Sequence, residues 1–377
     1  MSFAEAALDS CMRDAGGFEG NAQTLRILCK LEKRQTKQIK NDEPLTVNNG
    51  RDERVGLNLT FRTLAAVLKY DQQIPRQGKE RSGDKSKLVK GYYYTEADVV
   101  RQIKKHIGAT KTRNFKTIEC SIMDLADDIA YSTYDLEDSF KAGFLSPLSM
   151  FAAQNETIDE VAARVSERLR REYPSIKPAE VKLEVGHVYQ VLMGMFSDLF
   201  RNFDGEFKRV ADGKLDTVSA AGIISSLATI QSNMTAAAGY YRTKLTSELV
   251  GSFVRAVQVD ARQNNPALSR AYLDIETFKR VEVLKNFAYQ SLIMSPMLKV
   301  AEHRGKEIVT RIFNALNQDE GHLLMPEDCK AIYTGLSEPD EKRRVICDFI
   351  ACMTDRYAIQ FYNRLFGTTA ESIYSPL

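Results

Sequence analysis

Long apolar runs are missing from this sequence. None of its stretches approaches the roughly 18 consecutive apolar residues that a membrane-spanning helix needs. Its beginning, MSFAEAALDS, has neither the basic flank nor the apolar stretch of a signal peptide. These absences argue against a membrane role, and we expect a cytoplasmic protein.

Paired cysteine motifs and a strong charge imbalance are also missing. The six cysteines include no C-x-x-C pair, so neither a zinc knuckle nor a dithiol redox motif is visible. The formal net charge of +2 is too small to indicate a nucleic-acid partner by itself. With 44% hydrophobic residues, the chain has enough apolar surface for a folded core.

The apolar pattern is helical almost throughout. Apolar residues recur at three- and four-residue spacing in segments such as TLRILCKLEKR, FRTLAAVLKY and LTSELVGSFVRAV. Alternation with a period of two is confined to YRTKLT and VNNGRDERVGLNLT. The sequence therefore predicts an all-α protein with at most a minor β-hairpin.

The segment IMDLADDIAYSTYDLEDSF, residues 122–140, carries the pattern with most chemical meaning. Asp127, Tyr131 and Asp135 follow one another at four-residue spacing. On an α-helix, positions four apart drift by only about 40°, so the three side chains form one stripe. Two carboxylates and a phenol suit a site that holds a divalent cation, packs a sugar against the ring and accepts a hydroxyl proton.

A solvated acidic helix face is the alternative for this stripe, and on the charge run alone it is the commoner case. The flanking residues weigh against it, because an apolar side of the helix lies next to the acids and should be buried. That side is expected to consist of Ile122, Leu125, Ile129 and Leu136.

The segment ADDIAYSTYDLED resembles the signature with which dGTPase-type deoxynucleoside triphosphate triphosphohydrolases of the HD-domain superfamily provide their last metal ligand. The resemblance extends over almost the whole chain and implies an HD-domain-like helical bundle. Its other segments are GGFEGNAQTLRIL (16–28), GLNLTFRTLAAVLKY (56–70), GYYYTEADVV (91–100), SPMLKVAEHRGKEIVTRIF (295–313) and ICDFIACMTDRYAIQFYNRLFG (346–367).

The resemblance implies roles for the stripe. Asp127 would bind the metal, Tyr131 would pack against the deoxyribose, and Asp135 would accept the 3'-hydroxyl. Asp128 is the neighbour most easily confused with Asp127. Asp127 is preferred because only it keeps the four-residue register.

Further roles are implied outside the stripe. The family uses the residues matching Asn21, Lys69 and Tyr70 at the triphosphate, where amide donors and a cation suit phosphate oxygens. For Asn21 a turn or helix cap, and for Lys69 a helix C-terminal lysine, are the structural alternatives. Ser2 stands where the family has a catalytic His, and Glu5 matches the supporting catalytic Glu; its alternative is a solvated first-turn glutamate.

Relatives bind their metal through a His, a His-Asp pair and a final Asp, and this sequence has no His-Asp dipeptide. Its four histidines match none of those motifs. We expect an N-terminally incomplete HD-type bundle, explained by truncation or splitting or by degeneration to a regulatory form. A divalent metal (Mg, Mn or similar) would then be held weakly by this chain alone, which would hydrolyse little.

The function implied is hydrolysis of a dNTP, dGTP above all, to deoxynucleoside and triphosphate. Residues 1–142 would form the rest of the HD-type catalytic core, with a basic loop at 73–91. Residues 143–377 would form a helical C-terminal region, continuous with the core and used in homo-oligomer formation; the family commonly forms hexamers.

A non-catalytic nucleotide- or single-stranded-nucleic-acid-binding subunit is the alternative function. It depends on a basic stretch followed by three tyrosines, which could contact phosphates and stack on bases. A solvated loop with tyrosines packed at a helix start is the commoner structure for such a stretch. The residues concerned are Arg76, Lys79, Arg81, Lys85, Lys87, Lys90, Tyr92, Tyr93 and Tyr94.

Overall fold

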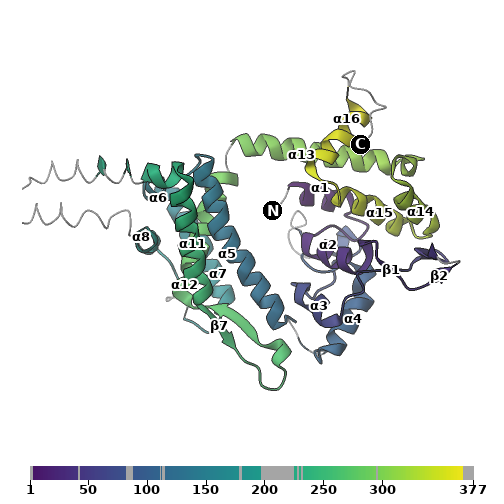
Figure 1. The fold of residues 1–377 in the computed structure, drawn as a ribbon, viewed down its shortest axis with the longest axis horizontal. Helices are drawn as coiled ribbons and strands as arrows, with labels where there is room; N and C mark the ends of the chain where they lie inside the picture. Colours follow the sequence, from purple (N-terminus) through teal and green to yellow (C-terminus); the bar gives the residue numbers. More distant parts are fainter. Residues whose placement is uncertain are drawn as a thin grey trace, which may run out of the picture. The chain divides into compact units, whose positions relative to one another are not determined.

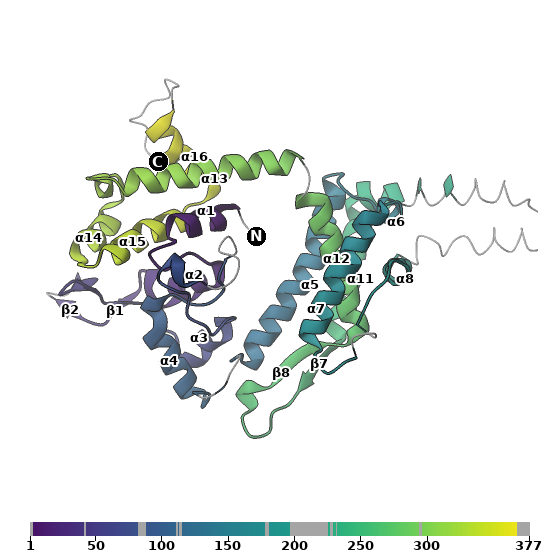
Figure 2. The ribbon, with the colours of Figure 1, turned by 180° about the vertical axis from the view of Figure 1, so that it is seen from behind.

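The chain forms two compact units, which Figures 1 and 2 show from opposite sides. Unit 1 comprises Met1–Ser121, Arg262–Ser269 and Val300–Leu377, and unit 2 comprises Ile122–Ala261 and Arg270–Lys299. The predicted division at residues 142 and 143 stays a prediction. The computed structural model describes residues 3–40, 43–81, 88–110, 112, 115–177, 181–196, 225–226, 229–230, 232–293 and 296–367.

Unit 1 consists mainly of short helices, several of which begin at capping hydroxyls. The Thr60 hydroxyl accepts a hydrogen bond from the Thr63 N–H, and Thr354 does the same for Tyr357. The helices are α1 (Phe3–Cys11), α2 (Gly20–Arg26), the π-helical turn η1 (Ile27–Leu31), α3 (Phe61–Val67), η2 (Gly78–Glu80), η3 (Tyr94–Glu96), α4 (Ala97–His106), η6 (Pro266–Leu268), α13 (Pro296–Leu316), η7 (Gly321–Leu324), α14 (Glu327–Gly335), α15 (Pro339–Ala351) and α16 (Asp355–Phe366).

The main core of unit 1 joins its first helix to its last ones. Leu8 of α1, Phe313 of α13 and Ile346 of α15 are buried in one cluster. Both ribbon views show α15 beside α1 (Figures 1 and 2). A second cluster holds Leu25 of α2 against Leu64 of α3 and neighbouring residues of α4. Helix α2 therefore lies between two apolar clusters.

A β-excursion between η1 and α3 confirms the hairpin predicted in VNNGRDERVGLNLT. Strands β4 and β5 pair antiparallel across Asn49 and Gly50, whose φ values of 47° and 73° are those of a tight hairpin turn. The antiparallel pairs are β1 (Gln35–Thr36) with β6 (Arg54–Gly56), β2 (Ile39–Lys40) with β3 (Glu43–Pro44), and β4 (Val47–Asn48) with β5 (Arg51–Asp52).

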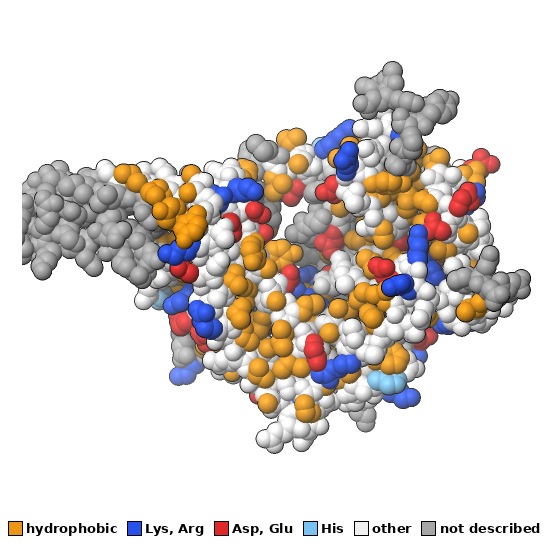
Figure 3. Space-filling view, viewed as in Figure 1, with side chains coloured by type: hydrophobic (Ala, Val, Ile, Leu, Met, Phe, Trp, Pro, Cys, Tyr) orange, Lys and Arg blue, Asp and Glu red, His pale blue; other side chains and the backbone are white. Residues whose placement is uncertain are grey.

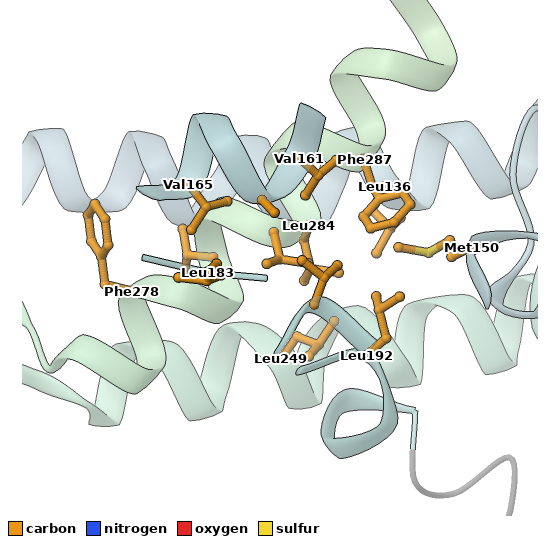
Figure 4. Packing of buried hydrophobic residues seen from close by; sticks show 14 of the residues in the cluster. Leu136, Met150, Val161, Val165, Leu183, Leu192, Leu249, Phe278, Leu284 and Phe287 are labelled. Carbon is orange, nitrogen blue, oxygen red and sulfur yellow. The ribbon is translucent and has the colours of Figure 1, made fainter. Parts of the chain in front are cut away.

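Unit 2 is a helical bundle around one large apolar cluster. Figure 4 shows Leu136, Val161, Leu284 and Phe287 pointing toward one another from α5, α7 and α12. Buried residues recur at helical spacing along each of these helices, so each helix buries one side. The helices are α5 (Ile118–Lys141), which begins in unit 1, α6 (Pro147–Phe151), α7 (Asn155–Glu172), α8 (Val185–Met195), α11 (Gly239–Arg255) and α12 (Ile275–Ile293).

The hairpin that follows α11 was not predicted. Strand β7 (Val257–Asp260) pairs antiparallel with β8 (Arg270–Leu273), and only β8 buries its alternate residues. The YRTKLT segment, which was the other hairpin prediction, is wrong because it lies inside α11. The described elements are otherwise helical, which confirms the all-α fold class. Among the residues described, no helix could cross a membrane.

We predict that Val161→Ala lowers the free energy of unfolding by about 2 kcal/mol, because it removes two buried methyl groups and leaves a cavity. The matched control is Val254→Ala, since Val161 is 0% and Val254 is 56% exposed and both lie in helices of unit 2. Alanine favours an exposed helical position, so the control should be neutral or slightly stabilising. Urea unfolding followed by circular dichroism measures both, and equal losses would contradict the packing described.

Candidate functional site

Helix α5 buries one side in the core of unit 2. The predicted stripe of Asp127, Tyr131 and Asp135 lies on another side of the helix. Ile129 and Leu136 are buried in the core of unit 2. Tyr131 is 50% exposed, and Asp127 and Asp135 are partly exposed. In the space-filling view, the face of unit 2 that is drawn has hydrophobic side chains among charged ones (Figure 3). The stripe is thus partly open while the adjacent side of the helix is packed.

One residue of the expected apolar side behaves differently. Ile122 is 50% exposed, so its predicted place in the core is wrong. Leu125 packs against the cluster while only partly buried. The core side is instead completed by small hydroxyl residues, since Ser132 and Thr133 are buried and both donate to the Ile129 carbonyl at 2.8 Å. Such internal hydrogen bonds allow polar residues to face a core.

Asp135 carries a perturbed carboxyl group. Burial, and then the neighbouring Asp138 carboxylate, raise the pKa of Asp135 above its ordinary value. A raised folded-state pKa means that the group's contribution to stability is complete below the ordinary pKa and is lost as pH rises through the raised value. The ionised form of Asp135 therefore opposes folding, as is frequent for carboxylates of functional sites.

Asp128, next to Asp127, is engaged in a cluster of ion pairs. Its carboxylate pairs with the Lys285 ammonium and, at 3.4 Å, with the Arg168 guanidinium. The nearly buried Glu282 lies 3.3 Å from Arg168 and 3.6 Å from Lys285. Burial lowers the pKa of Lys285, but Glu282 and Asp128 outweigh burial and raise it. Two acids and two bases from α5, α7 and α12 thus fix the rotation of α5.

Sequence reasoning missed this cluster, although one signal was present. Glu282 interrupts an apolar run in which Val281, Val283 and Leu284 are all buried. A charged residue that is flanked by core positions is expected to have a buried partner.

Glu5 and Asn21 each make a hydrogen bond at the start of α2. The Glu5 carboxylate, in the first turn of α1 and partly exposed, accepts a hydrogen bond from the Gly20 N–H at 2.8 Å, so it contacts the GGFEGN segment. Glu19 is the N-cap, and it accepts from the Ala22 N–H at 2.9 Å and from the Asn21 amide at 2.6 Å. Asn21 is therefore in the first turn of the helix and is not its cap.

Lys69 and Tyr70 follow the end of α3. The helix ends at Val67 and the Lys69 N–H donates to the Val67 carbonyl at 2.9 Å, so Lys69 lies in the turn that follows the helix. The Lys90 ammonium donates to the Tyr70 hydroxyl at 3.1 Å and lies 5.0 Å from the centre of its ring. A second cation therefore lies beside the tyrosine that the sequence assigned to phosphate binding.

No group of three or more His, Cys, Asp or Glu residues suited to a metal ion occurs in the part of the chain that the structure describes. The described residues around Asp127 therefore do not make a complete metal centre by themselves. Asp127 as a metal ligand stays a prediction.

The basic stretch is largely engaged within unit 1. Arg81 forms a buried ion pair with Asp9 at 2.7 Å. Tyr93 is 0% exposed, and burial raises its pKa well above the ordinary value. Arg76 donates to Asp340 at 2.6 Å. Arg81 and Tyr93 thus cannot contact or stack on a nucleic acid in this conformation, and Lys85 and Lys87 lie outside the described residues.

Lys285→Met should lower the free energy of unfolding by about 2 kcal/mol, since losing one partner of a buried ion pair costs roughly 3–5 kcal/mol and partial exposure reduces the loss. Lys279→Met on the same helix is the control, because Lys279 pairs with the exposed Glu276 and should lose less than about 1 kcal/mol. Thermal and urea unfolding measure the difference. Similar losses in both variants would show that the Asp128 cluster does not hold α5.

Comparison with known proteins finds one matching family description and several similar proteins. Residues 272–364 match the family described as phosphohydrolase-associated domain. The chain is 41% identical to the deoxyguanosinetriphosphate triphosphohydrolase-like protein 2 of Mesorhizobium japonicum, over 99% of this chain and 76% of that protein. It is 31% identical to a deoxyguanosinetriphosphate triphosphohydrolase-like protein of Aliivibrio fischeri, over 96% of this chain and 72% of that one. The chain therefore belongs to the family of deoxyguanosinetriphosphate triphosphohydrolase-like proteins.

Proposed function

We propose that this protein is a triphosphohydrolase for deoxynucleoside triphosphates, dGTP above all, which releases the deoxynucleoside and inorganic triphosphate. The observation that carries the proposal is the stripe on α5. It combines a half-exposed ring with two partly exposed carboxylates, one of which has a raised pKa. The names of the relatives support a deoxynucleoside triphosphate as the substrate class.

The stripe is proposed to recognise the sugar. The Tyr131 ring would pack against the deoxyribose and crowd the 2' position, so that a ribonucleotide fits less well. Asp135 would accept a hydrogen bond from the 3'-hydroxyl, and a charged acceptor makes this bond stronger than a neutral one. Asp128, paired with Lys285, would take no part in sugar binding.

The phosphates are proposed to be bound by Asn21, Lys69 and Tyr70, with Glu5 supporting catalysis. Lys90 adds positive charge beside the Tyr70 hydroxyl, which favours an anionic ligand there. The Glu5 contact with the Gly20 N–H links the proposed catalytic residue to the turn that presents Asn21.

A divalent cation, Mg or Mn, is proposed as the cofactor, with Asp127 as the carboxylate that this chain offers. A single carboxylate retains a divalent cation weakly, because ligand number and geometry determine affinity. We therefore expect weak metal binding and slow hydrolysis by this chain alone. The functional state is proposed to be a cytoplasmic homo-oligomer.

Asp135→Asn should weaken dGTP binding about 10- to 100-fold, since hydrogen bonds to charged groups contribute roughly 1.5–3 kcal/mol. The same variant should bind 2',3'-dideoxy-GTP as the unchanged chain does, because that nucleotide lacks the 3'-hydroxyl. Isothermal titration with Mg²⁺ present gives both affinities. Asp159→Asn is the matched control, since Asp159 is an exposed acid on α7 of the same unit.

Equal loss of affinity for dGTP and for the dideoxy nucleotide in Asp135→Asn would refute the assigned contact.

The reaction is tested separately, by incubating the protein with dGTP and Mn²⁺ and separating the products by ion-pair chromatography. Deoxyguanosine and triphosphate in equal amounts are expected, whereas dGMP and pyrophosphate would contradict the reaction. Tight, Asp135-dependent binding with no product at all would instead identify the non-catalytic nucleotide-binding subunit.

A further inference from the structure

The segment between α1 and α2 has a backbone that other parts of unit 1 hold in place. It includes Gly16 and Gly17, whose φ values of 88° and 65° are strained for other residues. The five consecutive backbone N–H groups from Gly16 to Gly20 all have partners. These are, in order, the Arg76 and Met12 carbonyls, the Asp9 carboxylate, the Tyr93 hydroxyl and the Glu5 carboxylate.

Helix α15 holds the carbonyl side of this segment through Arg344. The guanidinium Nη2 of Arg344 donates to the Ala15 carbonyl at 3.1 Å and to the Gly17 carbonyl at 2.6 Å. Its carbon lies 3.9 Å from the centre of the Tyr93 ring. Arg344 is 1% exposed, so these contacts replace its hydration.

The same helix holds α2 through Asp348. The Asp348 carboxylate accepts from the Arg26 guanidinium at 2.8 Å and from the Gln23 amide at 3.0 Å. Arg26 also pairs with the fully buried Glu96 at 2.7 Å. Arg344 and Asp348 are four residues apart in sequence, so they project from one side of α15, toward the segment and toward α2 respectively.

A third group of hydrogen bonds joins the segment to the end of the 73–81 stretch. The Asp9 carboxylate accepts from the Phe18 N–H at 2.9 Å and from Arg81 at 2.7 and 2.8 Å. A Cβ atom at Gly17 would lie only 2.3 Å from Arg81 Nη2 and 2.7 Å from Asp9 Oδ1. Even a methyl group at this position would therefore collide with the Asp9–Arg81 ion pair.

These buried charges are poorly explained by stability alone. Replacing a buried ion pair with apolar residues is often neutral or stabilising, so three buried arginines around one segment are not needed for a core. The three arginines do impose a single backbone conformation. A preorganised backbone strengthens binding because it loses less conformational entropy when the ligand binds. Asn21 follows Gly20 directly, so its position depends on this segment.

We propose that α15 is the positioning element for the phosphate-binding segment, with Arg344 and Asp348 as positioning residues that set Asn21 for the triphosphate of the substrate. The inference rests on the proposed function. It gives the phosphohydrolase-associated region, residues 272–364, in which α15 lies, the function of positioning the phosphate-binding segment. The ligand part concerned is the triphosphate alone, not the nucleoside.

Arg344→Lys tests the proposal with little change in charge or volume. A lysine ammonium ends nearer its own backbone than Nη2 of an arginine and has no planar group to lie on the Tyr93 ring, so hydrogen exchange in residues 15–21 should become faster in the chain without nucleotide. Affinity for dGTP should fall about 10-fold, the equivalent of one lost hydrogen bond of about 1.4 kcal/mol, while affinity for deoxyguanosine should not change. Arg356→Lys, on the exposed side of α16, is the matched control.

Gly17→Ala is a second variant that leaves α15 intact. Its control is Gly108→Ala, because Gly108 has a similar φ of 72° but a Cβ there meets only the Asn265 amide at 3.6 Å. Both variants carry the strain of a left-handed alanine, but only Gly17→Ala should loosen the segment and weaken dGTP relative to deoxyguanosine.

Two results would overturn the proposal. Unchanged exchange in residues 15–21 in Arg344→Lys and Gly17→Ala would show that α15 does not hold the segment. Equal losses for dGTP and deoxyguanosine would show general destabilisation instead of positioning of the triphosphate. A chain that binds no dGTP at all would refute the proposed function and the assigned ligand together, whereas faster exchange in the variants would still report the structural contact.

Discussion

Buried charge has to be paired, and this requirement organises both units of the protein. In unit 1, Arg344 reaches two carbonyl groups of a segment more than 300 residues earlier in the chain. In unit 2, Asp128 meets cations of two other helices. Each pairing restricts the position of an element that carries predicted site residues. The first fixes the backbone before Asn21, and the second fixes the rotation of α5.

The pairing of Asp128 also separates two adjacent acids that the sequence could distinguish only by register. Lys285 and Arg168 neutralise Asp128, so its charge is used within the bundle. Asp127, one residue earlier, belongs to the stripe with Tyr131. Asp127 as the metal ligand stays a prediction that rests on the four-residue spacing and on the family resemblance. The cluster gives Asp128 a role in packing within the bundle.

The sequence predicted local features well, because they depend on residues close together in the chain. The helical period identified α5 and its buried residues Ile129 and Leu136. It did not predict the exposure of Ile122, since burial depends on which helices pack nearby. Nor could it predict that Glu5 accepts from Gly20, or that α15 holds the segment before Asn21. Such contacts join distant residues, and a single sequence contains no periodic signal for them.

The raised pKa of Asp135 connects stability with the proposed role. Ionisation of Asp135 in the folded chain costs stability, because burial and Asp138 disfavour its charged form. A 3'-hydroxyl that donates to Asp135 stabilises that charged form, so nucleotide binding would lower the pKa of Asp135 and recover the lost stability. A neutral residue at this position would fold more easily and bind less well. Under the proposed function, the stability lost on ionisation of Asp135 is exchanged for a contact with the nucleotide.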